Sequence, residues 1–70
     1  MGPQERFAAN VKELRHERNW SQEDLSRYSG LHTTAISKLE CRERAAKFGT
    51  IVRLAEAFQV PAGRLFDGIP

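Results

Sequence analysis

Three hydroxyl side chains and one lysine fall on the same side of a short predicted helix that runs from Thr33 to about Cys41. At about 100° per residue, this polar side consists of Thr33, Thr34, Ser37, Lys38 and Cys41. Hydroxyl groups can donate hydrogen bonds to base edges or accept them, and a threonine methyl group can contact the methyl group of thymine. The polar side therefore has the chemistry of a surface that reads DNA bases. Taken alone, it is equally compatible with an ordinary exposed helix face.

The residues before this helix predict another helix and a tight turn. Ser21 and Asp24 have the spacing of a capping box, in which each side chain bonds the backbone N–H of the other residue. Gly30 follows nine residues after Ser21 and ends the helix, because glycine readily adopts the left-handed conformation. Two helices joined by a short turn that contains glycine are typical of a helix-turn-helix.

Helical periodicity also dominates the rest of the chain, and we find no convincing strand. We expect a first helix from about Gln4 to Arg18, with an apolar stripe of Phe7, Val11 and Leu14. We expect a fourth helix from Phe48 to Phe58, whose apolar stripe consists of Phe48, Ile51, Leu54, Ala55 and Phe58. A fifth, short helix begins after Pro61 and contains Leu65 and Phe66. The sequence predicts one all-α domain over residues 1–70, a compact five-helix bundle with its core at about 5–67.

Composition excludes several classes of protein. The chain has 70 residues and a formal net charge of +2, with a single cysteine, Cys41, and two histidines. An intrachain disulfide is impossible and a closed zinc site is not expected. We find no catalytic residue set, no membrane span and no secretory signal. We therefore expect a cytoplasmic protein that is not an enzyme, with no metal, no cofactor and no small-molecule ligand.

A basic stretch follows the polar helix. Arg42, Arg44 and Lys47 stand there with one acidic residue among them. Beside a DNA-reading helix, such side chains are expected to contact phosphates, and binding should then weaken steeply with salt. Four other basic residues are expected to be exposed charges on the flanks of the helices: Lys12, Arg18, Arg27 and Arg53.

Several segments together resemble the lambda-repressor-like, Xre/Cro family of bacterial and phage DNA-binding domains. They are Arg15, Trp20–Leu25, Ser29–Leu31, Ala35–Glu40 and Leu54–Val60. The resemblance covers roughly Phe7 to Phe66. It implies a five-helix domain whose third helix lies in the DNA major groove, usually as a dimer on a near-palindromic operator.

The resemblance also implies roles for individual residues. Thr33 and Thr34 match the base-contacting first turn of the third helix, with Ser37 and Lys38 further along the same face. Gln22 matches a phosphate-contacting position at the start of the second helix. Arg15 and Glu40 match a partly buried ion pair whose role is structural.

Four places depart from the family pattern. Ala45-Ala46 lies where a Pro is common. His32 replaces the usual Ser or Thr cap of the third helix, which predicts weaker capping or a cap that moves to Thr33. Ser26 replaces Ala, and its hydroxyl needs a partner. Arg42 stands where Gly is frequent, so we expect the third helix to continue past Cys41.

These observations predict a small, sequence-specific regulator of transcription, of repressor or controller type, that binds double-stranded DNA as a homodimer. Val60, Leu65 and Phe66 of the apolar C-terminal segment are the expected dimer surface. The alternative is a module of the same fold whose main partner is a protein, such as an antitoxin or a transcription co-regulator. DNA binding and oligomeric state distinguish the two.

Overall fold

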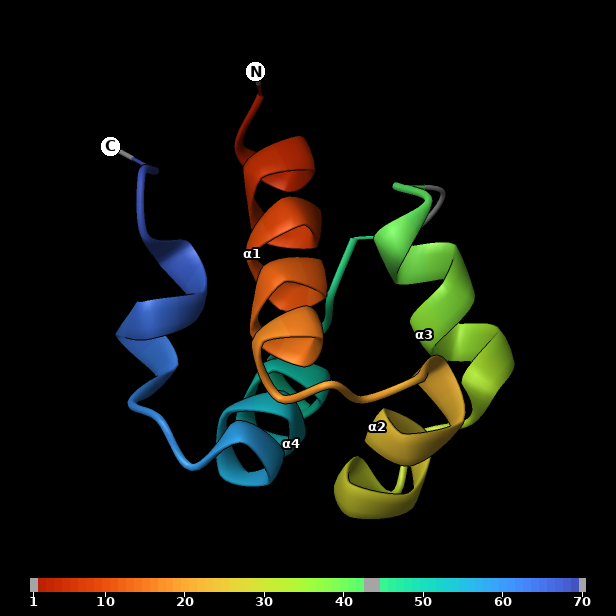
Figure 1. Cartoon of the computed structure of the whole chain (residues 1–70). Coiled ribbons are helices and arrows are strands. Elements are labelled where there is room, and N and C mark those ends of the chain that lie inside the picture. Colours follow the sequence, from red (N-terminus) through yellow and green to blue (C-terminus); the bar gives the residue numbers. More distant parts are fainter. Residues whose placement is uncertain (1, 43–44, 70) are drawn as a thin grey trace.

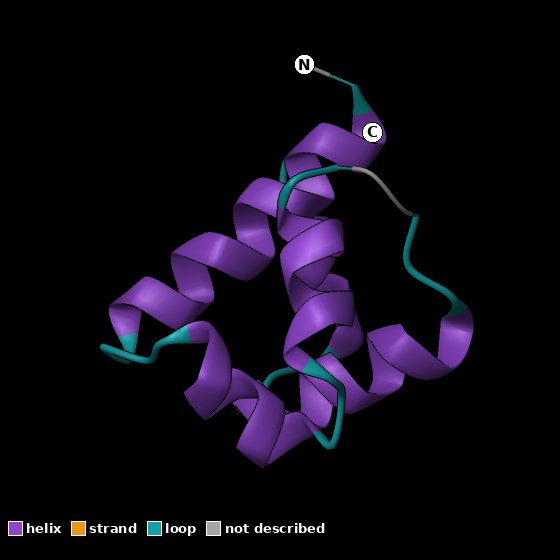
Figure 2. Ribbon diagram, turned by 90° about the vertical axis from the view of Figure 1, so that its right-hand side faces the viewer, coloured by secondary structure: helices purple, strands orange, loops and turns teal. Residues whose placement is uncertain are grey.

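The computed structural model describes residues 2–42 and 45–69. Over these residues the chain forms four α-helices and one 3-10 helix: α1 (Pro3–Glu17), α2 (Gln22–Ser29), α3 (Thr33–Glu40), α4 (Phe48–Phe58) and η1 (Ala62–Phe66). Figure 1 shows α4 crossing beneath α1, with α2 and α3 on one side of α1 and η1 on the other. Figure 2 shows the same residues as helices and loops without a strand, which confirms the all-α class.

The termini of α1 follow from its sequence. Pro3 occupies the first turn, where a missing backbone N–H costs nothing. The helix ends at Glu17, and Asn19 adopts a left-handed φ of 58°, which asparagine tolerates better than most residues. The helix therefore ends within one residue of Arg18, where the sequence predicts its end.

The turn between α2 and α3 depends on local hydrogen bonds. The predicted capping box is present: Ser21 Oγ accepts from the Asp24 N–H at 3.0 Å, and Asp24 Oδ2 accepts from the Ser21 N–H at 2.9 Å. Gly30 ends α2 with a φ of 75°. The Ser26 hydroxyl, which the sequence left in need of a partner, donates to the carbonyl of Leu31. These hydrogen bonds stabilise the turn and so help to set the angle between α2 and α3.

One expectation about a helix end is wrong. The third helix does not continue past Cys41: α3 ends at Glu40, and Arg42 adopts the left-handed φ of 67° that glycine would have taken. The Gln4 side chain supports this turn by donating to the carbonyl of Arg42 at 3.2 Å.

The prediction of a five-helix bundle is wrong in its count of α-helices: the described residues form four, and the fifth predicted helix is the 3-10 helix η1. It has five residues including Gly63, and its first bond runs from the Arg64 N–H to the carbonyl of Pro61 at 2.9 Å. So short a segment cannot build a continuous i to i+4 ladder, and the tighter i to i+3 turn satisfies more of its backbone. Asn10 of α1 fixes it in place, donating to the carbonyls of Leu65 at 2.9 Å and Asp67 at 2.8 Å.

All five helices contribute to one apolar core. Its most deeply buried large side chains are Val11, Leu14, Leu25, Ile36, Leu54, Phe58 and Leu65. Leu65 is 0% exposed, so the prediction that it lies on a dimer surface is wrong. Because η1 packs against both α1 and α4, this side chain belongs to the core. Phe48 departs from its predicted stripe in the opposite direction, with 81% of its surface exposed at the first turn of α4.

Candidate nucleic-acid interface

The polar side of α3 faces outward. Thr33 and Thr34 are exposed, and Ser37 and Lys38 are half-buried. Ile36 and Leu39, on the opposite side, are 1% and 6% exposed. Since α3 packs against α2 and α1 through this apolar side, its hydroxyl-bearing side stays free of the protein's own core.

The first turn of α3 has no side-chain cap. His32 occupies the N-cap position, and no cap hydrogen bond comes from its imidazole. This agrees with the weaker capping that the sequence predicts. Backbone N–H groups at the start of a helix carry partial positive charge, so an exposed first turn favours contact with an anion.

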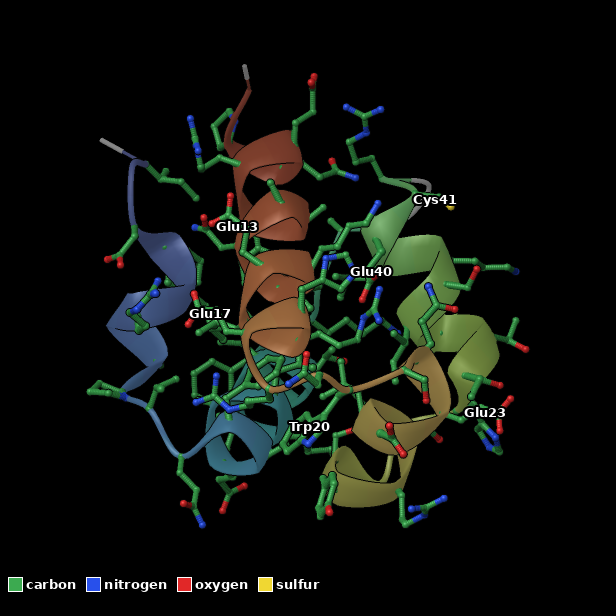
Figure 3. The ribbon with its side chains drawn as sticks, viewed as in Figure 1. Glu13, Glu17, Trp20, Glu23, Glu40 and Cys41 are labelled. Atoms are coloured by element: carbon green, nitrogen blue, oxygen red, sulfur yellow. The ribbon has the colours of Figure 1, made fainter. Side chains whose placement is uncertain are left out.

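A buried carboxylate joins the three helices around this surface. Glu40, at the last position of α3, accepts from Arg15 Nε at 2.9 Å and from Arg15 Nη2 at 3.0 Å. Arg15 Nη1 also donates to the carbonyl of Trp20 at 2.8 Å. The two ionic side chains are 9% and 4% exposed, and Figure 3 shows Glu40 lying between α1 and α3. This is the ion pair that the resemblance implies, and it fixes α3 on α1.

Gln22 belongs to the same cluster. Its Nε2 donates to Glu40 Oε1 at 3.3 Å, so its side chain connects the first residue of α2 to the last residue of α3. The sequence suggested a phosphate contact for Gln22 but gave no sign of this bond. Only the packing of α2 against α3 brings together two residues that are 18 positions apart.

The basic residues after α3 are only partly described. Arg42 is exposed, and its Nη1 lies 3.2 Å from Glu5 Oε2 of α1. Lys47 is exposed and is the N-cap residue of α4. Arg44, the third residue of the predicted phosphate-binding set, lies outside the described residues.

An aromatic stack behind the helix-turn-helix escaped the sequence analysis. The Trp20 ring stacks on Tyr28 with centroids 4.5 Å apart and on Phe58 at 5.7 Å. Arg18 was expected to be an exposed charge, but it is half-buried. It donates to the carbonyls of Leu14 at 3.2 Å and Phe58 at 2.6 Å. Its guanidinium lies over the rings of Trp20 and Phe58. Through Tyr28 and Phe58 the stack connects α2 to α4, and it so stabilises the position of the helix-turn-helix.

The capping box sets the charge state of one surface carboxylate. Hydrogen bonds from the backbone N–H and the hydroxyl of Ser21 lower the pKa of Asp24 below its ordinary value of 3.8, and the positive charge of Arg27 acts in the same direction. Asp24 therefore stays ionised, and keeps accepting from the Ser21 N–H, to a lower pH than an ordinary aspartate does.

Two further features are absent from the described part of the chain. The described residues contain no group of three or more His, Cys, Asp or Glu side chains that could hold a metal ion. Within residues 2–42 and 45–69, no helix combines the length and apolar composition that crossing a lipid bilayer requires.

Comparisons with known proteins agree with this geometry. The helix-turn-helix family model HTH_3 matches residues 11–65. The chain is 38% identical over 65 residues to the control protein C.SmaI of Serratia marcescens, covering 93% of this chain and 77% of that protein. It is also 38% identical over 58 residues to the HTH-type transcriptional repressor RghR of Bacillus subtilis, covering 81% of this chain and 43% of the repressor.

A solved structure extends the similarity to three dimensions. The restriction-modification controller protein C.AhdI of Aeromonas hydrophila superposes with a TM-score of 0.86 at 30% identity, over 90% of this chain and 96% of that one. The chain therefore belongs to the Xre-like helix-turn-helix family. This family consists of transcriptional regulators and not of enzymes.

Proposed function

We propose that this protein is a small transcription regulator, of controller or repressor type, that binds a specific double-stranded DNA site in the cytoplasm. The observation that carries the proposal is the outward side of α3, where hydroxyl groups stand free while the opposite side is buried. The names of three similar proteins support the same role: C.SmaI is a control protein, C.AhdI is a controller protein and RghR is a repressor.

In this proposal α3 enters the major groove. Thr33 and Thr34 contact base edges from its first turn, and Ser37 and Lys38 contact them one turn further along. Each mismatched base pair in a specific site typically costs about 1–3 kcal/mol of binding free energy. Because the hydroxyl side chains are short, α3 must approach the bases closely. Contacts between the protein and the DNA phosphates must therefore set the depth of α3 in the groove.

Those backbone contacts come from both sides of α3. Gln22 lies at the start of α2, while Arg42 and Lys47 lie at the two ends of the loop after α3. Arg44 stands between them in the sequence. Each ionic contact with a phosphate adds about 0.9 to the slope of log affinity against log salt. Three basic residues in each subunit therefore predict a strong dependence on salt.

A homodimer would place two copies of α3 in successive major grooves, about 34 Å apart. Phe66 is 38% exposed and Val60 is half-buried, so both remain candidates for the dimer surface after the exclusion of Leu65. Phe48 and Val52 join them, because they lie four residues apart on one face of α4 and are 81% and 37% exposed. Ile51 of α4 and Phe66 of η1 also line one apolar groove of about 220 Å³.

The experiment is selection of bound duplexes from a random DNA pool, followed by footprinting at several salt concentrations. The proposal expects an enriched near-palindrome, two protected half-sites and an affinity that falls steeply with salt. Thr34→Ala/Ser37→Ala is the matched variant, since both side chains lie on the polar side of α3. A monomer with no enriched sequence at any salt concentration would instead favour the protein-partner alternative.

A further inference from the structure

We infer that Glu40 is a positioning residue for the phosphate contact of Gln22, in addition to its ion pair with Arg15. The inference rests on the proposed function, since it concerns how the same DNA site is prepared. Its basis is the single bond from Gln22 Nε2 to Glu40 Oε1, at 3.3 Å.

The anchor is rigid. Both oxygens of Glu40 accept from Arg15, at 2.9 and 3.0 Å, and its side chain is 4% exposed. The paired geometry of the guanidinium fixes the plane of the carboxylate. The oxygen that Gln22 contacts is therefore held in one place before any DNA arrives.

The chemistry of the anchor selects one orientation of the amide. An ionised carboxylate only accepts hydrogen bonds, so it turns the NH₂ group of Gln22 toward itself and the amide oxygen away. A side-chain amide has two N–H donors. With one donated to Glu40, the other remains available for a phosphate oxygen, and the half-buried position of Gln22 leaves its outer side open to solvent.

Charge balance makes this arrangement compatible with DNA. A lone carboxylate beside a phosphate would repel it, but the bidentate contact from Arg15 neutralises Glu40 locally. The ion pair thus holds Gln22 with a strong acceptor and adds no net charge to the surface. Pre-ordering a flexible side chain removes part of the entropic cost of binding.

A double-mutant cycle on DNA affinity tests the inference. Its four proteins are the wild type, Gln22→Ala, Arg15→Met/Glu40→Leu and the combination of all three. Replacing a buried ion pair by apolar residues of similar volume is often neutral or stabilising, so the second variant is designed to fold without the anchor. Thermal unfolding by circular dichroism checks this, and ethylation interference on the selected DNA site reports which phosphates each protein contacts.

We expect Gln22→Ala to weaken binding about tenfold in each half-site, as for loss of a hydrogen bond to a charged group. Replacing Arg15 and Glu40 should weaken binding by a similar factor and erase the interference of the same phosphate. The combination should be no weaker than either variant, because both remove one contact. Losses that multiply, or an unchanged interference pattern in Arg15→Met/Glu40→Leu, would overturn the inference.

A second measurement needs no variant at the ion pair. In the free wild-type protein, ¹⁵N relaxation should show the side-chain amide of Gln22 restricted, while that of Gln59, which is exposed, moves freely. Equal mobility of the two amides would overturn the inference even if the double variant failed to fold. If the wild type binds no DNA at all, the proposed function itself fails, and that outcome is distinct from a wild type that binds with additive losses.

Discussion

Arg42 Nη1 lies 3.2 Å from Glu5 Oε2, so the first basic residue after α3 is paired with the first turn of α1 in the free protein. Both side chains are about half exposed, at 54% and 47%, and such surface pairs contribute about 0–1 kcal/mol. A phosphate can therefore displace Glu5 at little cost, but the carboxylate competes with DNA for the same guanidinium.

We predict that Glu5→Gln binds DNA about two- to fivefold more tightly at low salt, since it frees Arg42 and removes a negative charge beside the phosphates. The gain should shrink as salt increases. Fluorescence anisotropy over a salt series measures it. Glu13→Gln is the control, because it makes the same change in net charge on an exposed part of α1 that points away from α3 (Figure 3). Equal effects of the two variants would show that only net charge matters.

Base reading and phosphate contact should separate in a pair of variants. Thr34→Ala should change the preferred base at particular positions of the selected site, because its hydroxyl and methyl groups face base edges in the proposal. Lys47→Ala should weaken all sequences about equally and reduce the salt slope by about 0.9. Parallel selections and salt titrations measure both effects. The same uniform loss in both variants would contradict this division of roles.

The Arg15–Glu40 pair predicts a large effect on folding. Arg15→Ala leaves the Glu40 carboxylate buried without its partner and should lower the free energy of unfolding by about 3–5 kcal/mol. Urea denaturation followed by circular dichroism measures it. Lys12→Ala, an exposed change on the same helix, should cost less than about 0.5 kcal/mol. A loss below 1 kcal/mol in Arg15→Ala would mean that the pair does not hold α3 on α1.

Acid should weaken the helix-turn-helix through Asp24. The pKa of this carboxyl is lower in the folded protein than in the unfolded chain, so its contribution to stability is present above the unfolded pKa and is lost as pH falls through the folded one. Asp24→Asn should therefore unfold with a weaker dependence on pH in the acid range than the wild type. Urea midpoints at a series of acidic pH values measure the difference. Glu56→Gln, an exposed change in α4, serves as the control, and an identical pH dependence of wild type and Asp24→Asn would contradict the prediction.

The proposed dimer surface predicts an effect of Phe48. Phe48→Ser should shift the protein from dimer to monomer in sedimentation velocity and weaken operator binding, because an isologous interface loses the side chain from both subunits. Each subunit should still fold, since the ring is 81% exposed in one subunit. Glu13→Ser, an exposed change on α1 outside this surface, is the control. A Phe48→Ser protein with unchanged mass would remove α4 from the dimer surface.

Local signals made most of the fold predictable. The Ser21–Asp24 box, Gly30 and the apolar spacing of Phe7, Val11 and Leu14 act within one or two helical turns, so a sequence contains them directly. The outward side of α3 followed from the same periodicity.

Tertiary contacts account for what the sequence did not reveal. Arg18 is half-buried because its guanidinium donates a hydrogen bond to the carbonyl of Phe58, 40 residues away. Gln22 likewise donates to Glu40 of another helix. Arg42 adopts a left-handed turn supported by Gln4 of α1, against the preference of its own side chain. The choice between core and surface for Leu65 and Phe48 likewise depends on how η1 and α4 pack, since both residues are equally apolar in sequence.

The central claim is that the hydroxyl-bearing side of α3 contacts DNA bases. Titration of the ¹⁵N-labelled protein with its selected operator tests it directly by NMR. We predict that the largest shift changes fall on Thr33, Thr34, Ser37 and Lys38, with smaller changes at Gln22 and Lys47 and almost none at Glu13 on the far side of α1. Shift changes that spare α3, or their absence with every duplex and at every ionic strength, would contradict the account.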